Sequence, residues 1–332
     1  MMDILRTGFL PPRDLGEELR GRVETLSREM AGARTSDLGR ALNSDFSRLS
    51  QDARRLGLHA EKSASLSAAA SWGQALQTSL NAVGADLRIL LEAQVTAFPP
   101  DGAMNPELLA DTGQAALEDM VASFNARQGG RALFGNGRPD GTPLVVATDI
   151  LADVRQLAAS ASDARTFLGD LDSYFSPGGV LSVQIEALLP DGPVIAPTGE
   201  GDGVAWPVDM SSKGIGDALS GAAIAAVLPD LGFEMSDRDR QELVEALVQR
   251  AGSARDSLIA LQGRVGVVEA RIGRMSEDLD AAHASSRADL SAAVGIDPYE
   301  TATRLQEDMS RLDTTYAIVA KRARLRLTDW LR

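Results

Sequence analysis

The residue types that most often carry catalysis or metal binding are scarce in this chain. His59 and His283 are its only two histidines, and cysteine is absent. Without cysteine there are no disulfides, thiolate metal sites or cysteine nucleophiles. Neither histidine lies in a His-Glu-x-x-His motif, and a lone histidine pair makes a poor zinc site. We therefore predict no catalytic residue, no metal ligand and no cofactor, and we interpret both histidines as packing or solvated side chains.

Glycines and acidic residues offer no better candidate. Gly135–Gly137 and Gly214–Gly216 lack the Gly-Lys-Ser/Thr ending of a phosphate loop and the full dinucleotide fingerprint, so we interpret them as turn glycines. Carboxylates are too numerous, at 47, for any pair of them to indicate acid–base catalysis. They have no EF-hand spacing, so a solvated acidic surface is favoured over a calcium site. We expect a protein that is not an enzyme.

Charge and hydropathy exclude two classes of partner. Lys and Arg number 33 against 47 Asp and Glu, a formal net charge of −14, which argues against nucleic acid because phosphate binding needs a basic surface. No stretch approaches the roughly 18 consecutive apolar residues of a transmembrane helix, so we predict no membrane insertion. The N-terminal residues also lack the apolar segment of a cleaved secretory signal.

A basic cluster and a tryptophan stand out near the C-terminus. Lys321, Arg322, Arg324 and Arg326 could bind an anionic partner, or they could interact with the C-terminal dipole of their own helix. Both interpretations remain open. Trp330 could pack within its helix, but we favour an interface, where large aromatic side chains contribute most.

The elements that would position these residues are long helices. Apolar residues recur at spacings of 3 and 4 in stretches 76–94, 258–282 and 305–330, and in a shorter stretch at 15–30. This spacing gives each helix one apolar stripe, which must pack on a partner helix. The predicted assembly interface consists of the stripes nearest the two ends: Leu15, Leu19, Val23, Leu26, Leu305, Met309, Leu312, Tyr316, Val319, Ala323, Leu327, Trp330 and Leu331.

The middle of the chain has a different pattern. Most of the 14 prolines lie between Pro99 and Pro229, whereas residues 13–98 and 230–297 contain none. Because proline is disfavoured inside helices, its distribution marks a boundary between helical flanks and a different central region. The predicted strands there are Leu144–Val146, Val180–Ile185 and Val204–Val208, and the predicted helices are Asp149–Ala161 and Ile215–Val227.

These patterns together predict a mainly α fold. The N- and C-terminal flanks form a long antiparallel helical coiled-coil shaft, and a small α+β insert domain lies between them. The predicted domains are a terminal helical polymerisation region (1–45 and 285–332), a helical shaft (46–135 and 236–284) and a variable insert (136–235).

Three stretches of the chain carry a further pattern. Leu76–Gln94 has the apolar spacing of a long shaft helix, Gly129–Leu144 (GGRALFGNGRPDGTPL) is a turn-rich connector, and Ile296–Arg332 has an acidic helix start, a heptad of Leu and polar residues, and a closing Leu-x-Leu-x-x-Trp-Leu. In this chain order they resemble the bacterial flagellin superfamily, and within it the hook–filament junction type (hook-associated protein 3), whose similar connector leads from the shaft into the outer domain.

The resemblance implies a structural adaptor between hook and filament, outside the cell. Its expected partners are hook-associated protein 1, flagellin, other copies of itself in a ring or helical assembly, and an export chaperone on the C-terminal helix. Export would use the flagellar type III apparatus without a cleaved signal peptide. A filament-forming flagellin is the first alternative, and a secreted coiled-coil scaffold from outside the family is the second.

Overall fold

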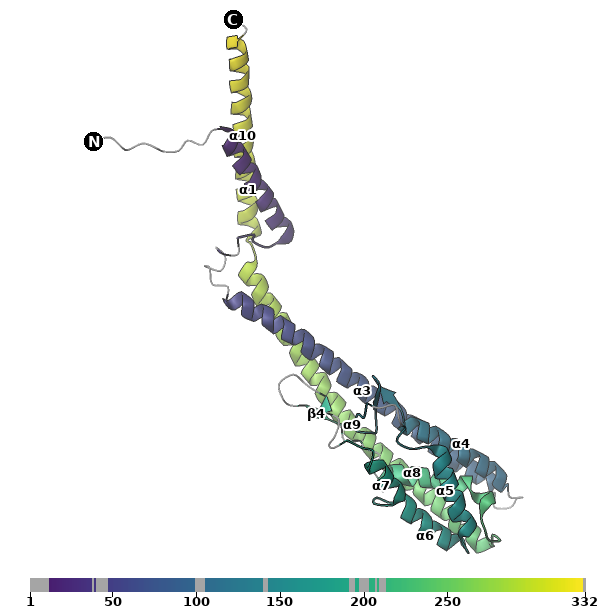
Figure 1. Ribbon diagram of the computed structural model, residues 1–332. Helices are drawn as coiled ribbons and strands as arrows, with labels where there is room; N and C mark the ends of the chain where they lie inside the picture. The colour runs from purple at the N-terminus through teal and green to yellow at the C-terminus, as the bar shows by residue number, and fades with distance from the viewer. Residues whose placement is uncertain are drawn as a thin grey trace. The chain divides into compact units, whose positions relative to one another are not determined.

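The structure is a computed structural model that describes residues 12–37, 39, 47–98, 105–139, 143–190, 195–196, 203–206, 208 and 213–330. This part of the chain is mainly helical, as predicted (Figure 1). The helices are α1 (Pro12–Gly32), α3 (Ser47–Ala97), α4 (Pro106–Phe124), α5 (Ala147–Ser160), α6 (Ala164–Phe175), α7 (Val180–Glu186), α8 (Lys213–Ala226), α9 (Asp237–Val294) and α10 (Pro298–Trp330), with a 3-10 turn at Leu228–Asp230.

The described residues also form two small antiparallel ribbons. One pairs β1 (Arg127–Gln128) with β2 (Arg131–Ala132), and the other pairs β3 (Ile195–Ala196) with β4 (Val204–Ala205). Gly129 and Gly130, at φ 56° and 79°, form the turn between β1 and β2. Positive φ at both turn positions favours glycine in a tight hairpin.

The chain divides into two compact units, and each is described separately. Unit 1 comprises residues 1–59 and 280–332, and unit 2 comprises residues 60–279. The helices α3 and α9 contribute residues to both units.

The core of unit 2 uses the stripes that the sequence predicts. On α3, Leu76, Leu80, Val83, Leu87 and Leu90 are all nearly or fully buried, and on α9 the buried residues include Leu258, Leu261, Val265 and Ile272. The two helices run antiparallel. The amide of Gln77 donates to the carbonyl of Gln262 (3.1 Å), and Gln262 in turn donates to Oδ1 of Asn81 (2.8 Å).

Helix starts follow the expected capping chemistry. The side chain of Asn105 accepts from the N–H of Leu108 (3.1 Å) at the start of α4, with Pro106 in the first turn. Ser236 and Asp239 bond each other's backbone N–H groups at the start of α9, each at 3.2 Å. These are the pairings that side-chain caps make with the free N–H groups of a first turn.

Two of the strands predicted in the middle are wrong. Val180–Ile185 lies in helix α7, where Leu181 and Ile185, four residues apart, are buried on one face. Leu144–Val146 is not a strand, because the side chain of Asn125 takes the place of a neighbouring strand. Its Oδ1 accepts from the N–H of Leu144 and its Nδ2 donates to the carbonyl of Val145, both at 2.7 Å.

Other elements of the middle differ in extent. The third predicted strand is confirmed only as β4, while α5 and α8 match the two predicted helices closely. The interpretation of Gly214–Gly216 as a turn is wrong, because these residues lie in the first turn of α8. Helix α6 is not predicted from the sequence, although Asp163 marks its start as a side-chain cap that accepts from the N–H of Thr166 at 2.8 Å.

One partly buried carboxyl in unit 2 is expected to make stability depend on pH. Asp86 lies on α3, and its Oδ2 has no hydrogen-bond partner among the described residues. Burial, together with the charge of Asp119 on α4, raises the pKa of Asp86 to about 6. The folded state therefore holds a proton that the unfolded chain releases near pH 4, so this group makes unit 2 less stable as pH rises from about 4 to about 6.

We expect Asp86→Asn to remove the loss of unit 2 stability between pH 4 and pH 6. Asparagine keeps the shape without the charge, so the variant gains about 1 kcal/mol over the wild type at pH 7, a figure reduced for the partial exposure of the group. At pH 4 the two should be equally stable. Urea denaturation at both pH values measures the difference, and equal effects of the substitution at pH 4 and pH 7 would contradict this assignment.

Candidate assembly interface

All the predicted interface residues that the structure describes lie on α1 and α10 of unit 1, two helices from opposite ends of the chain that pack against each other (Figure 1). Local sequence marks the start of α10 and the end of α1. Asp297 caps α10 by accepting from the N–H groups of Tyr299 (2.8 Å) and Glu300 (3.1 Å). At the other helix, α1 ends at Gly32 and Ala33 has a positive φ of 48°, which turns the chain.

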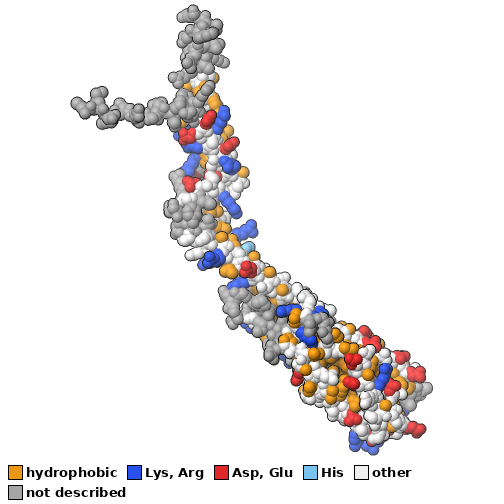
Figure 2. Space-filling view, viewed as in Figure 1, with side chains coloured by type: hydrophobic (Ala, Val, Ile, Leu, Met, Phe, Trp, Pro, Cys, Tyr) orange, Lys and Arg blue, Asp and Glu red, His pale blue; other side chains and the backbone are white. Residues whose placement is uncertain are grey.

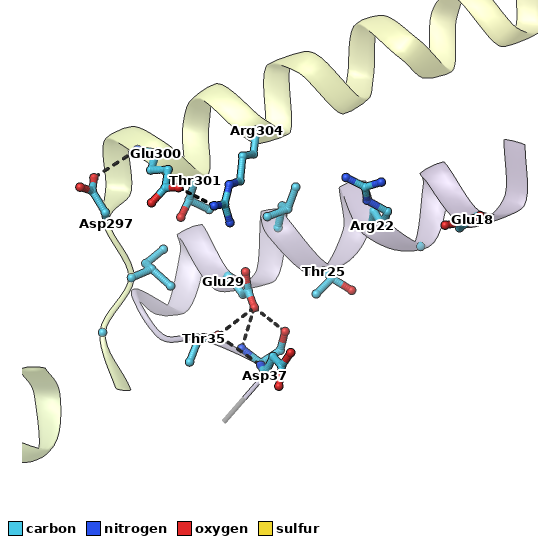
Figure 3. A pocket seen from close by; sticks show the side chains of 15 residues that line it. Glu18, Arg22, Thr25, Glu29, Thr35, Asp37, Asp297, Glu300, Thr301 and Arg304 are labelled. Atoms are coloured by element: carbon cyan, nitrogen blue, oxygen red, sulfur yellow. Dashed lines mark hydrogen bonds and ion pairs between the residues drawn. The ribbon is translucent and has the colours of Figure 1, made fainter. Parts of the chain in front are cut away.

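The turn after α1 is tied to the segment before α10. The N–H of Thr35 donates to the carbonyl of Val294 (2.9 Å), and Arg34 forms a β-bridge with Gly295. Glu29 closes the turn by accepting from the N–H (2.7 Å) and the hydroxyl of Ser36 (Figure 3). The hydroxyl and N–H of Ser36 hold the pKa of Glu29 below its usual range. These bonds set the starting register of α1 on α10.

The α10 face turned toward α1 is partly polar. Thr301, Asp308 and Thr315 are buried at spacings of 7 residues, and Asp308 is only 1% exposed. Its carboxylate pairs with Arg22 of α1, whose Nη2 lies 2.9 Å from Oδ2 and 3.2 Å from Oδ1. Arg311, on α10 itself, lies farther away, with 3.7 Å between its Nη1 and Oδ1 of Asp308. A buried charge at one layer of a helix pair favours one register over others.

The structure separates the predicted interface residues into three groups. Leu19 is buried, and five more are partly buried in unit 1: Val23, Leu26, Leu305, Leu312 and Val319. Leu15, Met309 and Tyr316 are exposed, at 40%, 51% and 38%. The side chains of Ala323, Leu327 and Trp330, and all of Leu331, lie outside the described residues.

Arg22 and Asp308 are not among the residues predicted from the sequence. Met309 is predicted in the apolar stripe of α10, whereas Asp308 is the buried residue at that level of the helix. A signal was present, because Leu305, Asp308 and Leu312 follow the 3-then-4 spacing of a packed stripe. A search for apolar spacing does not detect a carboxylate at such a position. The ion pair is also not predictable from local pattern, because Arg22 lies far from Asp308 in the sequence.

Apolar side chains elsewhere on α10 remain exposed in the described part of unit 1. Met309 and Ile318 are each 51% exposed, and their spacing of nine residues places them on opposite sides of the helix. The guanidinium of Arg20 on α1 lies 5.1 Å from the ring centroid of Tyr316. Figure 2 shows apolar side chains interspersed with charged ones along these two helices. Surfaces of this mixed composition occur both at protein–protein contacts and elsewhere on protein surfaces.

A groove of about 650 Å³ lies between α1, the turn after it and the start of α10 (Figure 3). Its walls are polar and carry charges of both signs, including Arg22, Arg304 and Glu18. Several of these charges are already paired, since Glu29 accepts from Ser36, and Arg304 pairs with Glu300. The groove therefore has the character of a solvated interhelical surface.

The two histidines come together in unit 1. Their rings lie 6.0 Å apart between centroids in an edge-to-face arrangement, His59 on α3 and His283 on α9. No group of three or more His, Asp or Glu side chains able to hold a metal ion occurs among the described residues. Two imidazoles alone provide fewer ligands than protein zinc sites use.

Comparison with protein-family models found no matching family, and comparison with curated proteins found no match. Within the described helices, none is both long enough and apolar enough to cross a bilayer.

Proposed function

We propose that this protein is a structural adaptor of the bacterial flagellum, joining the hook, through hook-associated protein 1, to the flagellin filament. In this proposal the flanks form an antiparallel helical shaft that carries the central insert, and the helices at both ends polymerise. The protein reaches the cell exterior through the flagellar type III apparatus, with an export chaperone on its C-terminal helix.

One observation carries the proposal. Helices α1 and α10 come from opposite ends of the chain and pack together, yet they leave Leu15, Met309 and Ile318 exposed. Burial of exposed apolar side chains between neighbouring subunits stabilises an assembly by roughly 25 cal/mol per Å² of apolar surface removed from water. A protein that assembles through its paired ends would present this kind of surface. The resemblance of three sequence stretches to the flagellin superfamily supports the same assignment.

The test is the copy number of this protein in purified hook–filament structures, measured by quantitative mass spectrometry. A trace amount that is enriched when filaments are sheared to hook ends supports the junction adaptor. Abundance as the dominant subunit would instead make the protein a filament flagellin. Absence from the structures would overturn both and leave a secreted coiled-coil scaffold.

Trp330 offers a second test of assembly. In the proposal its indole contacts a neighbouring subunit, so Trp330→Ala should impair incorporation at the hook end while leaving unit 2 folded. Motility and hook-end incorporation measure the first effect, and circular dichroism of the purified variant checks the second. Trp72→Phe, on α3 in unit 2, is the matched aromatic control and should incorporate normally. Normal incorporation of the Trp330 variant would contradict this role.

A further inference from the structure

One exposed face of α9 in unit 2 carries small, apolar and charged residues. The face lies opposite the buried stripe that includes Leu258 and Val265. Its members are all exposed to solvent, and their spacings return to the same side of the helix. They are Asp256, Ile259, Ala260, Gly263, Val267, Ala270 and Arg274, called here the outer α9 face.

Apolar side chains on this face are unusually accessible. Val267 is 70% exposed and Ile259 is 55% exposed. Gly263 lies near the middle of the face, inside a 58-residue helix, although glycine is a poor helix former. A side chain there would meet nothing within 4 Å in the described part of the chain. The packing of the chain on itself therefore does not require glycine at this position, whereas the close approach of a second helix would use it.

The face is complementary to itself when one copy is reversed. Residues equally distant from Val265 on either side form matched pairs: Asp256 with Arg274, Ala260 with Ala270, and Gly263 with Val267. Two antiparallel copies would thus place opposite charges together at both ends and a valine against a glycine twice in the middle. A parallel arrangement would instead place Asp256 on Asp256 and Arg274 on Arg274.

The charges at both ends of the face are available for such a contact. Among the described residues, neither Asp256 nor Arg274 forms an ion pair or a side-chain hydrogen bond. Two neighbouring polar residues differ in this respect, because the guanidinium of Arg250 pairs with Asp172 and the hydroxyl of Ser253 donates to Asp217. A chain with a net charge of −14 repels its copies, so local opposite charges are needed to orient an encounter.

We propose that the outer α9 face binds the outer α9 face of a second copy of this chain, antiparallel and with two-fold symmetry. A two-fold contact of this kind uses one patch on both copies and closes at a dimer. The inference goes beyond the flagellar proposal and does not depend on it, because it is tested on the purified chain alone.

The test measures self-association of the full chain by sedimentation equilibrium at low ionic strength. The wild type should form a dimer that dissociates as salt is raised. Asp256→Arg and Arg274→Asp should each weaken it about tenfold or more, because two ion pairs per dimer become two repulsive pairs. The double exchange D256R/R274D should restore the dimer. Asp111→Arg, on the exposed side of α4, is the matched charge control and should leave it unchanged.

A mixture of the two single variants provides a further test of the contact. Antiparallel pairing predicts that D256R and R274D, each monomeric alone, form a dimer with each other because both of their ion pairs are then of opposite sign. A monomeric wild type, a dimer insensitive to either reversal, or a double exchange that fails to restore association would each overturn the proposal. Circular dichroism of the variants confirms that α9 remains helical, so loss of association is assigned to the contact.

Discussion

Replacing Gly113 with alanine is expected to destabilise unit 2 by about 2 kcal/mol. Gly113 lies on α4 where this helix packs on α8. An added Cβ would lie 2.5 Å from the Cβ of Ala225 and 2.6 Å from the backbone N of Ala226. A methyl group and a backbone atom cannot rotate away, so the two helices must separate. Overpacking of this kind costs about 1–3 kcal/mol, which exceeds the gain of up to about 1 kcal/mol in helix propensity.

A second glycine provides the control for that prediction. Gly84 also lies inside a helix, α3, but a Cβ there would meet nothing within 4 Å in the described part of the chain. Gly84→Ala should therefore stabilise the protein by about 0.5–1 kcal/mol, through helix propensity alone. Urea denaturation followed by far-ultraviolet circular dichroism compares the two variants. Effects of the same sign would refute the close approach of α4 and α8.

Removal of the Arg22 guanidinium is expected to loosen the α1–α10 pair by about 2 kcal/mol. Arg22→Met keeps the aliphatic stem but leaves the carboxylate of Asp308 buried without its closest cation. The side chain of Asp308 is 2% exposed, so it cannot regain water without opening the helix pair. A charged group left unpaired in this way costs more than the ion pair itself contributes. Arg311, at 3.7 Å, compensates in part, which keeps the expected loss moderate.

The reciprocal change should have a different result. In Asp308→Leu the buried charge disappears, and Arg22, whose side chain is 53% exposed, returns to water. We therefore expect a small loss or a gain in stability, and the double variant R22M/D308L should be more stable than R22M alone. Hydrogen exchange of the α1 amides reports this local opening. Equal losses of stability in R22M and D308L would contradict the assignment of the destabilisation in R22M to an unpaired, buried carboxylate.

The substitutions of Gly113 and Arg22 perturb different units through different physical effects. Gly113 tests steric contact in unit 2, whereas Arg22 tests a buried charge in unit 1. If Asp308 selects the register of α1 on α10, R22M/D308L should retain stability while assembling less regularly, because an apolar pair permits neighbouring registers. That outcome would separate the role of the ion pair in folding from its role in assembly.

Periodicity by itself determined the long helices of this protein and much of the unit 2 core. The leucines at 76, 80, 87 and 90 are buried as the spacing on α3 predicts. Helix starts at Asn105, Ser236 and Asp297 were also predictable, because a cap needs only a side chain and the N–H groups two or three residues later. These features depend on neighbours in the sequence.

Features that join distant residues required the tertiary structure. The run Val180–Ile185 has the composition of a strand, yet burial of Leu181 and Ile185 in unit 2 makes it a helix, since packing overrides β propensity. The role of Asp308 depends on Arg22, and that of Gly113 on Ala225, and both partners are remote along the chain. A local pattern gives the side of a helix that is apolar, but only three-dimensional packing decides which neighbour covers that side and what remains exposed.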